Sequence, residues 1–372
     1  MKVIIGKSDL EYGLGMVIGA VDKKKLCDYL GSVFIRSYTG SSGVELYATD
    51  MELSASILLE GIETVDAGEM VLPAEKLFSV VKNCGTGNIA ISGEINASIV
   101  GAVAEYHING LDAAGFPLVV TDDYEIAFGF PAGLLASCIN SVKHAECRDQ
   151  AKSNINCINF TLTETGTLVV VATDGHRMSL AAIELPGEYI LNKFRQFKFS
   201  LSHKAAALLG RIITSMTVGR FEKQNRLYFQ SKSTSICVVE SASEYPDVRR
   251  IIPSGHGDVI TVDTDALIGA IESTCIISDD AYRSINLDIS DEKITITAIG
   301  TNSTSRSVIP CMCDCVIKIR INSTYLLQAL KSMNSAETFI KYFGITAPVM
   351  FMPADYKQWN ERLDIIMPLG GE

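Results

Sequence analysis

The sequence lacks several features that would assign it to common protein classes. It has no run of about 20 apolar residues, the length that a membrane-spanning helix needs. Its first residues lack the apolar core and small-residue cleavage site of a secretory signal. No Walker A phosphate loop and no G-x-S-x-G nucleophile elbow occurs. We therefore expect a soluble, cytoplasmic chain that is not an enzyme.

Positive charge is also in short supply. There are 32 Lys and Arg residues against 43 Asp and Glu residues, which gives a net charge of -11. A protein that coats DNA needs many cations to neutralise phosphates, so this balance argues against such a protein. It leaves open a protein that encloses DNA in a local basic channel, because net charge describes the whole surface.

Histidine is scarce, and the cysteines do not have the spacing of a metal site. The chain has five His and ten Cys residues, and most of the cysteines lie in apolar stretches. Cys311, Cys313 and Cys315 alternate, which predicts that they share one face of a strand. No His and no second Cys pair lies near them, so a plain strand is favoured over a metal site. We expect no metal and no cofactor.

The chain contains an internal repeat. Ala48-Thr49-Asp50 recurs as Ala172-Thr173-Asp174, and residues 298–302 resemble both. The repeat length is close to one third of the 372 residues, and each copy ends a strand-like run. The repeat predicts three domains, 1–120, 121–252 and 253–372, with linkers at 116–123 and 244–257.

A shorter repeat lies inside each third. Six times, a short strand-like run leads into a helical pattern, with helix starts near residues 8, 73, 131, 201, 263 and 322. The candidate caps and first-turn residues are Ser8, Pro73, Pro131, Ser202, Asp263 or Thr264, and Asn322 or Ser323. One helix and about four strands, used six times, predict an α+β fold in which each helix packs on a sheet.

Lysine and arginine residues recur in or just after these helices, whereas the fifth helix is acidic. Any one of them is best interpreted as a solvated side chain. Their shared place in the repeat favours a common basic surface.

Four motifs give the sequence a resemblance to a known family. They are VATDGHRM at 171–178, YPDVRRIIP at 245–253, LDAAGFP at 111–117 and IIMPL at 365–369. In this order and spacing they resemble the beta subunit of bacterial DNA polymerase III, the sliding clamp. The resemblance implies a DNA-clamp fold in which two copies close head to tail into a ring, with helices lining the hole. It places Tyr106, Ile108, Ile276 and Ile277 at the dimer interface.

The resemblance also implies a function. Sliding clamps are processivity factors that encircle duplex DNA and tether the replicative polymerase, the clamp loader and repair proteins through short linear motifs. It implies a peptide-binding pocket between the second and third domains, formed by Ile155, Thr173, Gly175, His176, Arg177, Met178, Pro246, Arg250, Ile251, Met367, Pro368 and Leu369. The candidate DNA contacts are Lys24, Lys25, Lys143, Arg148, Lys152, Lys204 and Arg211. Such a protein is expected in the cytoplasm, associated with the nucleoid.

Two other hypotheses remain. One is a clamp-derived scaffold that no longer slides on DNA, and the other is a hydrolase that uses Asp174, His176 and Ser179. Two departures from the family pattern are also present. Gly370, Gly371 and Glu372 stand where a basic and an apolar residue usually end the chain, and Asn154 stands where aromatic residues are common. These departures predict a different preference for partner peptides.

Overall fold

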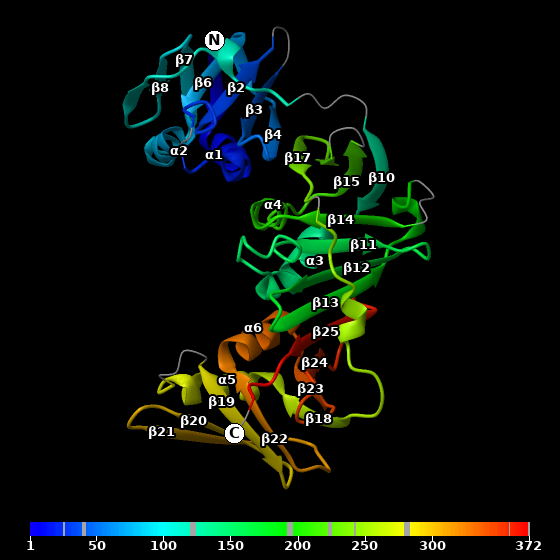
Figure 1. The fold of residues 1–372 in the computed structure, drawn as a ribbon. Helices are drawn as coiled ribbons and strands as arrows, with labels where there is room; N and C mark the ends of the chain where they lie inside the picture. Colours follow the sequence, from blue (N-terminus) through cyan, green and yellow to red (C-terminus); the bar gives the residue numbers. More distant parts are fainter. Residues whose placement is uncertain are drawn as a thin grey trace. The chain divides into compact units, whose positions relative to one another are not determined.

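In the computed structural model the chain forms two compact units. Figure 1 labels helices and strands along the chain. The structure describes residues 1–24, 27–38, 42–119, 124–191, 196–221, 225–241, 243–278, 283–356 and 358–370. Unit 1 comprises Met1–Leu135, Tyr189–Asn192 and Lys204–Glu240. Unit 2 comprises Ala136–Glu188, Lys193–His203 and Ser241–Glu372. The division passes through the middle third of the sequence, because the two halves of that third belong to different sheets.

Unit 1 contains two antiparallel sheets. The smaller has five strands, in the spatial order β5 (Glu63–Asp66), β1 (Lys2–Gly6), β7 (Asn88–Gly93), β8 (Ala97–Val100) and β9 (Glu105–Ile108). The larger has eight strands, in the order β10 (Glu125–Phe130), β15 (Met216–Phe221), β16 (Arg226–Gln230), β17 (Thr234–Val239), β4 (Leu53–Glu60), β3 (Gly43–Thr49), β2 (Ser32–Ser37) and β6 (Gly68–Pro73).

Unit 2 also contains two antiparallel sheets. The larger has eight strands, in the order β14 (Phe197–Leu201), β11 (Ile158–Leu162), β12 (Thr167–Thr173), β13 (Arg177–Glu184), β25 (Glu361–Ile366), β24 (Val349–Pro353), β23 (Glu337–Tyr342) and β18 (Asp258–Asp263). The smaller has four strands, in the order β21 (Thr304–Pro310), β20 (Lys293–Ile299), β19 (Ser284–Ser290) and β22 (Ile317–Asn322).

Each α-helix follows one strand and precedes a meander of three strands, so the predicted combination of one helix and four strands is confirmed. One further strand, β5, pairs with β1. The α-helices of the described residues are α1 (Lys7–Val17), α2 (Ala74–Asn83), α3 (Leu134–Val142), α4 (His203–Leu209), α5 (Thr264–Cys275) and α6 (Ser323–Met333). The three strands after each helix form a meander. The first strand of the meander pairs with the strand that precedes a different helix. This exchange ties two consecutive helix-plus-strand units together.

Two of the predicted helix caps are confirmed and one is wrong. The Asp263 carboxylate accepts a hydrogen bond from the Ala266 amide at 2.7 Å, and the Asn322 side chain accepts one from the Tyr325 amide at 3.1 Å. Ser8 does not cap α1, because β1 stays paired with β7 as far as Gly6 and the helix begins directly after it. Ser8 therefore lies inside the first turn.

Each eight-stranded sheet contains a junction between two meanders of three strands. In unit 1, β4 pairs antiparallel with β17, from Leu53↔Val238 to Ile57↔Thr234. In unit 2, β13 pairs antiparallel with β25, from Arg177↔Ile366 to Ala182↔Glu361. In both cases the third strand of one meander meets the third strand of another. The two remaining third strands, β9 and β21, lie at the edges of their sheets.

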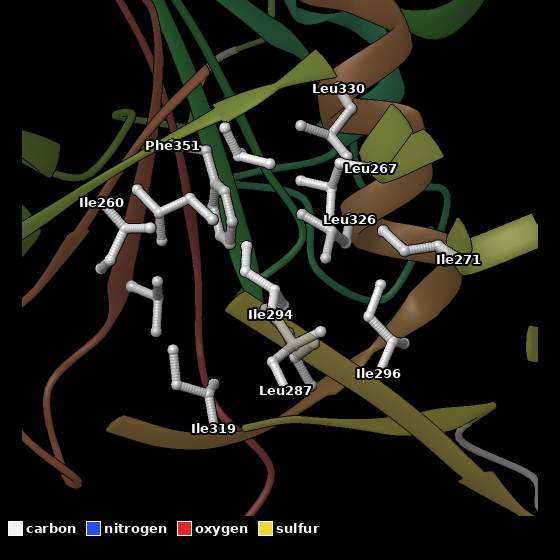
Figure 2. Packing of buried hydrophobic residues seen from close by; sticks show 14 of the residues in the cluster. Ile260, Leu267, Ile271, Leu287, Ile294, Ile296, Ile319, Leu326, Leu330 and Phe351 are labelled. Carbon is white, nitrogen blue, oxygen red and sulfur yellow. The ribbon is translucent and has the colours of Figure 1, made fainter. Parts of the chain in front are cut away.

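The core of the last third shows how these layers pack. Figure 2 shows Leu267 and Ile271 of α5 and Leu326 and Leu330 of α6 beside isoleucines and leucines of the neighbouring strands. All four helix residues are at most 1% exposed. Burial of each such side chain contributes about 1.5–3 kcal/mol, so the apolar faces of the two helices fix this domain.

The strand predicted around Cys311, Cys313 and Cys315 is wrong. β21 ends at Pro310, opposite Lys293, the first residue of β20, and the Cys311 amide makes one further hydrogen bond to the Glu292 carbonyl, at 2.9 Å. Beyond it, only Met312 forms an isolated bridge, with Thr261. In the described part of the chain, no group of three His, Cys, Asp or Glu side chains is arranged to hold a metal ion.

A membrane-spanning segment was not expected, and none of the helices described by the structure is both long and apolar enough to form one.

Candidate functional site

The turn between β12 and β13 is the best-defined candidate site. The Asp174 carboxylate accepts hydrogen bonds from the amides of His176, at 2.9 Å, and Arg177, at 3.1 Å. The Thr173 hydroxyl donates to the Arg177 carbonyl at 2.6 Å and accepts from the Gly175 amide at 3.2 Å. Gly175 has a φ of 93°, which glycine adopts without strain. These bonds hold the exposed His176 on a rigid turn.

Arg177 is fixed by three neighbours. Its Nε donates to Asp174 Oδ2 at 3.0 Å, and its Nη1 donates to Gln328 Oε1 at 2.5 Å. The guanidinium carbon lies 4.2 Å from the centre of the Tyr325 ring, so the cation stacks on the aromatic face. Burial, and next to it the charge of Asp174, raise the pKa of the Tyr325 hydroxyl. The side chain of Arg177 is held in one orientation.

An apolar cluster lies beneath this turn. Met178 is 2% exposed and packs in a cluster with Val248, Met350, Leu363 and Ile365. Tyr245, Ile252, Phe343 and Met352 are partly buried against the same cluster. Methionine side chains adapt their shape to different apolar groups, so this cluster can form the floor of a site that accepts several partners.

The C-terminal segment closes one side of the site. The Met367 amide donates to the His176 carbonyl at 3.0 Å, directly after β25 ends. The Met367 side chain remains 41% exposed, and that of Ile251 is 46% exposed. Exposed apolar side chains beside a fixed arginine suit the binding of an extended peptide.

The structure brings together some of the predicted pocket residues. Hydrogen bonds of the turn link Thr173, Gly175, His176, Arg177 and Met367, and Met178 lies in the apolar cluster beneath them. The segment with Pro246, Arg250 and Ile251 is connected through Val248 to the Met178 cluster, and Arg250 Nε donates to Asp247 Oδ2 at 3.0 Å. The Ile155 amide donates to the Lys152 carbonyl at 3.0 Å, and Lys152 Nζ donates to the Asp174 carbonyl at 3.2 Å. Pro368 and Leu369 instead line a groove beside β22.

Two residues that hold Arg177, Tyr325 and Gln328, were not predicted from the sequence as site residues. The third, Asp174, was predicted only as part of the hydrolase hypothesis. Tyr325 and Gln328 are three residues apart and therefore share a face of α6. That spacing was a signal, but the sequence does not reveal which strand the face meets.

The arrangement does not fit the hydrolase hypothesis. Asp174 binds the backbone amide of His176 and the side chain of Arg177. Ser179 is fully buried, its hydroxyl donates to the Ser141 carbonyl at 3.3 Å, and it accepts from Arg362 at 3.0 Å. A nucleophile must reach both its base and its substrate, and Ser179 is placed to reach neither.

A buried ionic network lies behind the turn. Arg362 Nη1 is 2.9 Å from Asp364 Oδ2, and His144 Nε2 is 2.6 Å from Asp364 Oδ1. Arg362 Nη2 also donates to the Ser141 carbonyl at 2.8 Å and to the Ser332 hydroxyl at 2.7 Å. Burial alone would raise the pKa of Asp364, but the charges of Arg362 and His144 outweigh burial and lower it. The network joins β13, β25, α6 and the end of α3.

The predicted DNA contacts have different local surroundings. Lys24, Arg148 and Arg211 are exposed. Lys143 Nζ donates to Asn140 Oδ1 at 2.7 Å and is exposed as well. Lys204 Nζ is already bound to the Val21 carbonyl, at 2.9 Å, and to the Asp50 carboxylate. Lys25 lies outside the described residues.

The predicted interface residues lie at or near the two sheet edges named above. Tyr106 and Ile108 belong to β9; Ile108 is 3% exposed, so its side chain packs inside its own domain. Ile276 and Ile277 follow α5, a helix that contacts β21, and Ile276 is 83% exposed.

Comparisons with known proteins identify the family. Residues 1–120 match the N-terminal domain of the DNA polymerase III beta subunit, and residues 249–368 match its C-terminal domain. Together these models cover more than half of the sequence. The chain belongs to the DNA polymerase III beta subunit family. This family consists of beta sliding clamps, which are processivity factors of DNA replication and not enzymes.

Relatives agree over nearly the whole chain. A beta sliding clamp of Rickettsia bellii is 22% identical over 99% of each chain, and one of Caulobacter vibrioides is 25% identical over 80% of each. A solved Pseudomonas aeruginosa sliding clamp, bound to griselimycin, superposes with a TM-score of 0.90 at 20% identity, covering 100% of this chain and 99% of that one. A Thermotoga maritima beta subunit has a TM-score of 0.89 at 19% identity, covering 100% of both. These structures confirm the clamp fold.

Proposed function

We propose that two copies of this chain close head to tail into a ring that encircles duplex DNA. The observation that carries the proposal is the pair of unpaired edges, β9 and β21. Both are third strands of a meander, the position that forms the junction in each eight-stranded sheet. Pairing of β21 of one copy with β9 of the other would repeat that junction and remove both edges.

Enclosure accounts for sliding on DNA without tight binding. A closed ring cannot leave a duplex sideways, so weak contacts to phosphates suffice, and contacts to bases are unnecessary. The exposed Lys24, Lys143, Arg148 and Arg211 are the best candidates for these contacts. Lys25 and Lys152 remain candidates, and Lys204 is the weakest because its ammonium group is already bound.

The second part of the proposal is peptide docking within unit 2. The docking site is formed by Arg177, Met367, Ile251 and the apolar cluster around Met178, and is called the Arg177 site. A relative from Caulobacter crescentus, with a TM-score of 0.88 at 20% identity, was solved with polyethylene glycol bound at a region assigned to beta-motif tethering. Here the fixed Arg177, the exposed Met367 and Ile251 and the Met178 cluster suit an extended segment with apolar anchors. The replicative polymerase, the clamp loader and repair proteins are the proposed partners, in the cytoplasm at the nucleoid.

The ring is tested first by molar mass. Light scattering should give about twice the 40.3 kDa of one chain. Ile276→Asp would bury a charge at the seam and should give a monomer. Ile213→Asp is the matched control, since Ile213 is 74% exposed and belongs neither to β9 nor to β21. A wild-type monomer at micromolar concentration contradicts ring closure.

Topology is tested on DNA. The protein is loaded onto a nicked circular plasmid with its clamp loader and ATP, separated from free protein and then exposed to a restriction enzyme. A ring stays on the circle and slides off the linear form. Equal retention on both forms would reject sliding and favour the scaffold hypothesis.

A further inference from the structure

A groove that is separate from the Arg177 site lies beside it, on the outer face of the four-stranded sheet of unit 2. It has a volume of about 860 Å³ and is lined by side chains of β19 and β22, by Tyr342 and Ile345, and by Pro368 and Leu369. Ile345 is 78% exposed, and Ile299 of β20, which also lines the groove, is 65% exposed. The groove therefore has room for several side chains and offers them apolar contacts.

The C-terminal segment forms a wall between this groove and the Arg177 site. The Met367 amide donates to the His176 carbonyl at 3.0 Å, and two residues later the Leu369 amide donates to the Arg320 carbonyl at 2.7 Å. Two residues of chain span at most about 7 Å. An extended peptide bound at the Arg177 site would thus enter the groove after a few more residues, at about 3.3 Å per residue.

The charge of the groove differs from that of the whole chain. Lys318 and Arg320 are both exposed, and they lie two residues apart on one face of β22. Asp288 is the only carboxylate among the residues that line the groove in the described part of the chain. The groove is thus locally basic on a chain with a net charge of -11. Two cations against one carboxylate favour an acidic ligand over a basic or neutral one.

We propose that this groove binds an acidic segment that flanks the apolar anchors of the partner peptide. Carboxylates of the segment would lie against Lys318 and Arg320, and an apolar residue would pack on Ile345 and Tyr342. The inference rests on the proposed docking at the Arg177 site, and it names an additional specificity surface for that docking. The groove would also give the protein a preference for acidic partner segments. The C-terminal tail does not provide this preference, because Gly370 stands where the family usually has a basic residue.

The test compares three synthetic fluorescein-labelled peptides by fluorescence anisotropy with the full-length protein. The first is an extended peptide with leucine and phenylalanine anchors. The second adds Asp-Glu-Asp-Ile, and the third adds Asn-Gln-Asn-Ile. Each extension is placed at the N-terminal end in one series and at the C-terminal end in another, because the direction of binding is part of the measurement.

The acidic extension at one of the two ends should tighten binding about threefold to tenfold, because exposed charge pairs contribute modestly. The neutral extension should give less than half of that gain. The K318E/R320E variant should abolish the difference between the acidic and neutral peptides, and so should high salt in the wild type. K293E is the matched control: Lys293 is exposed at the start of β20, in the same sheet but outside the groove, and this variant should retain the gain.

Failure of the groove is distinguishable from failure of the docking site. Should the anchor peptide itself not bind the wild-type protein, the proposed docking is wrong. Should it bind while acidic and neutral extensions at both ends behave alike, or should K293E and K318E/R320E weaken the acidic peptide equally, the groove is rejected and the docking site stands.

Discussion

The two meander junctions have the same backbone but opposite chemistry. Aligning the Thr-Asp turns at Asp50 and Asp174 places Ala55 opposite Ile236 in unit 1, and Ser179 opposite Asp364 in unit 2. The first pair is apolar and buried. The second belongs to the network of Arg362, Asp364 and His144. The repeat therefore fixes which strands pair, whereas the side chains at the two junctions differ.

The turns beside these junctions differ in the same way. Asp50 accepts from the amides of Glu52, at 3.0 Å, and Leu53, at 2.7 Å, just as Asp174 accepts from those of His176 and Arg177. The second carboxylate oxygen of Asp50 binds Lys204, which locks α4 to the turn. That of Asp174 binds Arg177. The turn at Asp50 therefore stabilises the packing of α4, whereas the turn at Asp174 presents Arg177 to a candidate ligand.

Replacing the aspartate of the ionic junction with the isoleucine of the apolar junction should have the largest effect on the free energy of unfolding. Asp364→Ile introduces the residue of the first junction and leaves Arg362 buried without its carboxylate. Removal of one partner of a buried ion pair costs about 3–5 kcal/mol. Urea unfolding followed by circular dichroism should show a loss of that size in the transition that reports on unit 2.

The control is the double variant R362M/D364I, which replaces the whole pair with apolar side chains. Such replacements are often neutral or stabilising, so most of the lost stability should return. Equal destabilisation by the single and the double variant would show that the ion pair itself is not the cause.

The same network predicts a dependence on acid. The pKa of Asp364 is lowered in the folded protein, chiefly because Arg362 and His144 outweigh the effect of burial. An aspartate with a lowered pKa adds stability above its unfolded pKa, about 3.9, and that stability is lost as pH falls through the folded pKa. The free energy of unfolding of the wild type should therefore fall more steeply below about pH 4 than that of R362M/D364I. Parallel curves for the two proteins would rule out this role.

Copying the first turn into the second should affect binding more than stability. Arg177→Leu places there the residue that corresponds to Leu53, and it removes the guanidinium from the site. Affinity for the leucine and phenylalanine peptide should fall at least about tenfold, since fixed arginines often dominate an interface. Unchanged affinity would show that the peptide binds elsewhere.

Lys204→Ala is the matched control at the other turn. It removes the cation that Asp50 binds, and it should cost about 1.5–3 kcal/mol of stability, the usual contribution of a hydrogen bond to a charged group. Peptide affinity should stay within twofold of the wild type. A loss of affinity in K204A would show that the two turns are not independent.

The sequence was sufficient to predict the repeating helices and strands, but it was insufficient to predict which strands pair with one another. Hydrophobic periodicity and caps such as Asp263 and Asn322 placed the helices, because these signals are local. Nothing local states that β13 pairs with β25, or that Arg362 lies against Ser141, 221 residues away. The motif at 171–178 located the turn through a family resemblance. The role of Tyr325 and Gln328 required the packing of α6.

The smallest effect is expected from the backbone of the two turns. Met51 has a φ of 75° and Gly175 a φ of 93°, so a side chain is tolerated in the first turn at the cost of some strain. A Cβ on Gly175 would meet only Lys152 Nζ, at 3.8 Å, so Gly175→Met should cost about 1 kcal/mol through conformation alone. The reverse change, Met51→Gly, should shift stability by less, because the greater freedom of glycine in the unfolded chain offsets the strain relieved. Urea unfolding measures both, and a loss well above 2 kcal/mol in G175M would mean that the second turn, unlike the first, also depends on close contact with a neighbouring side chain.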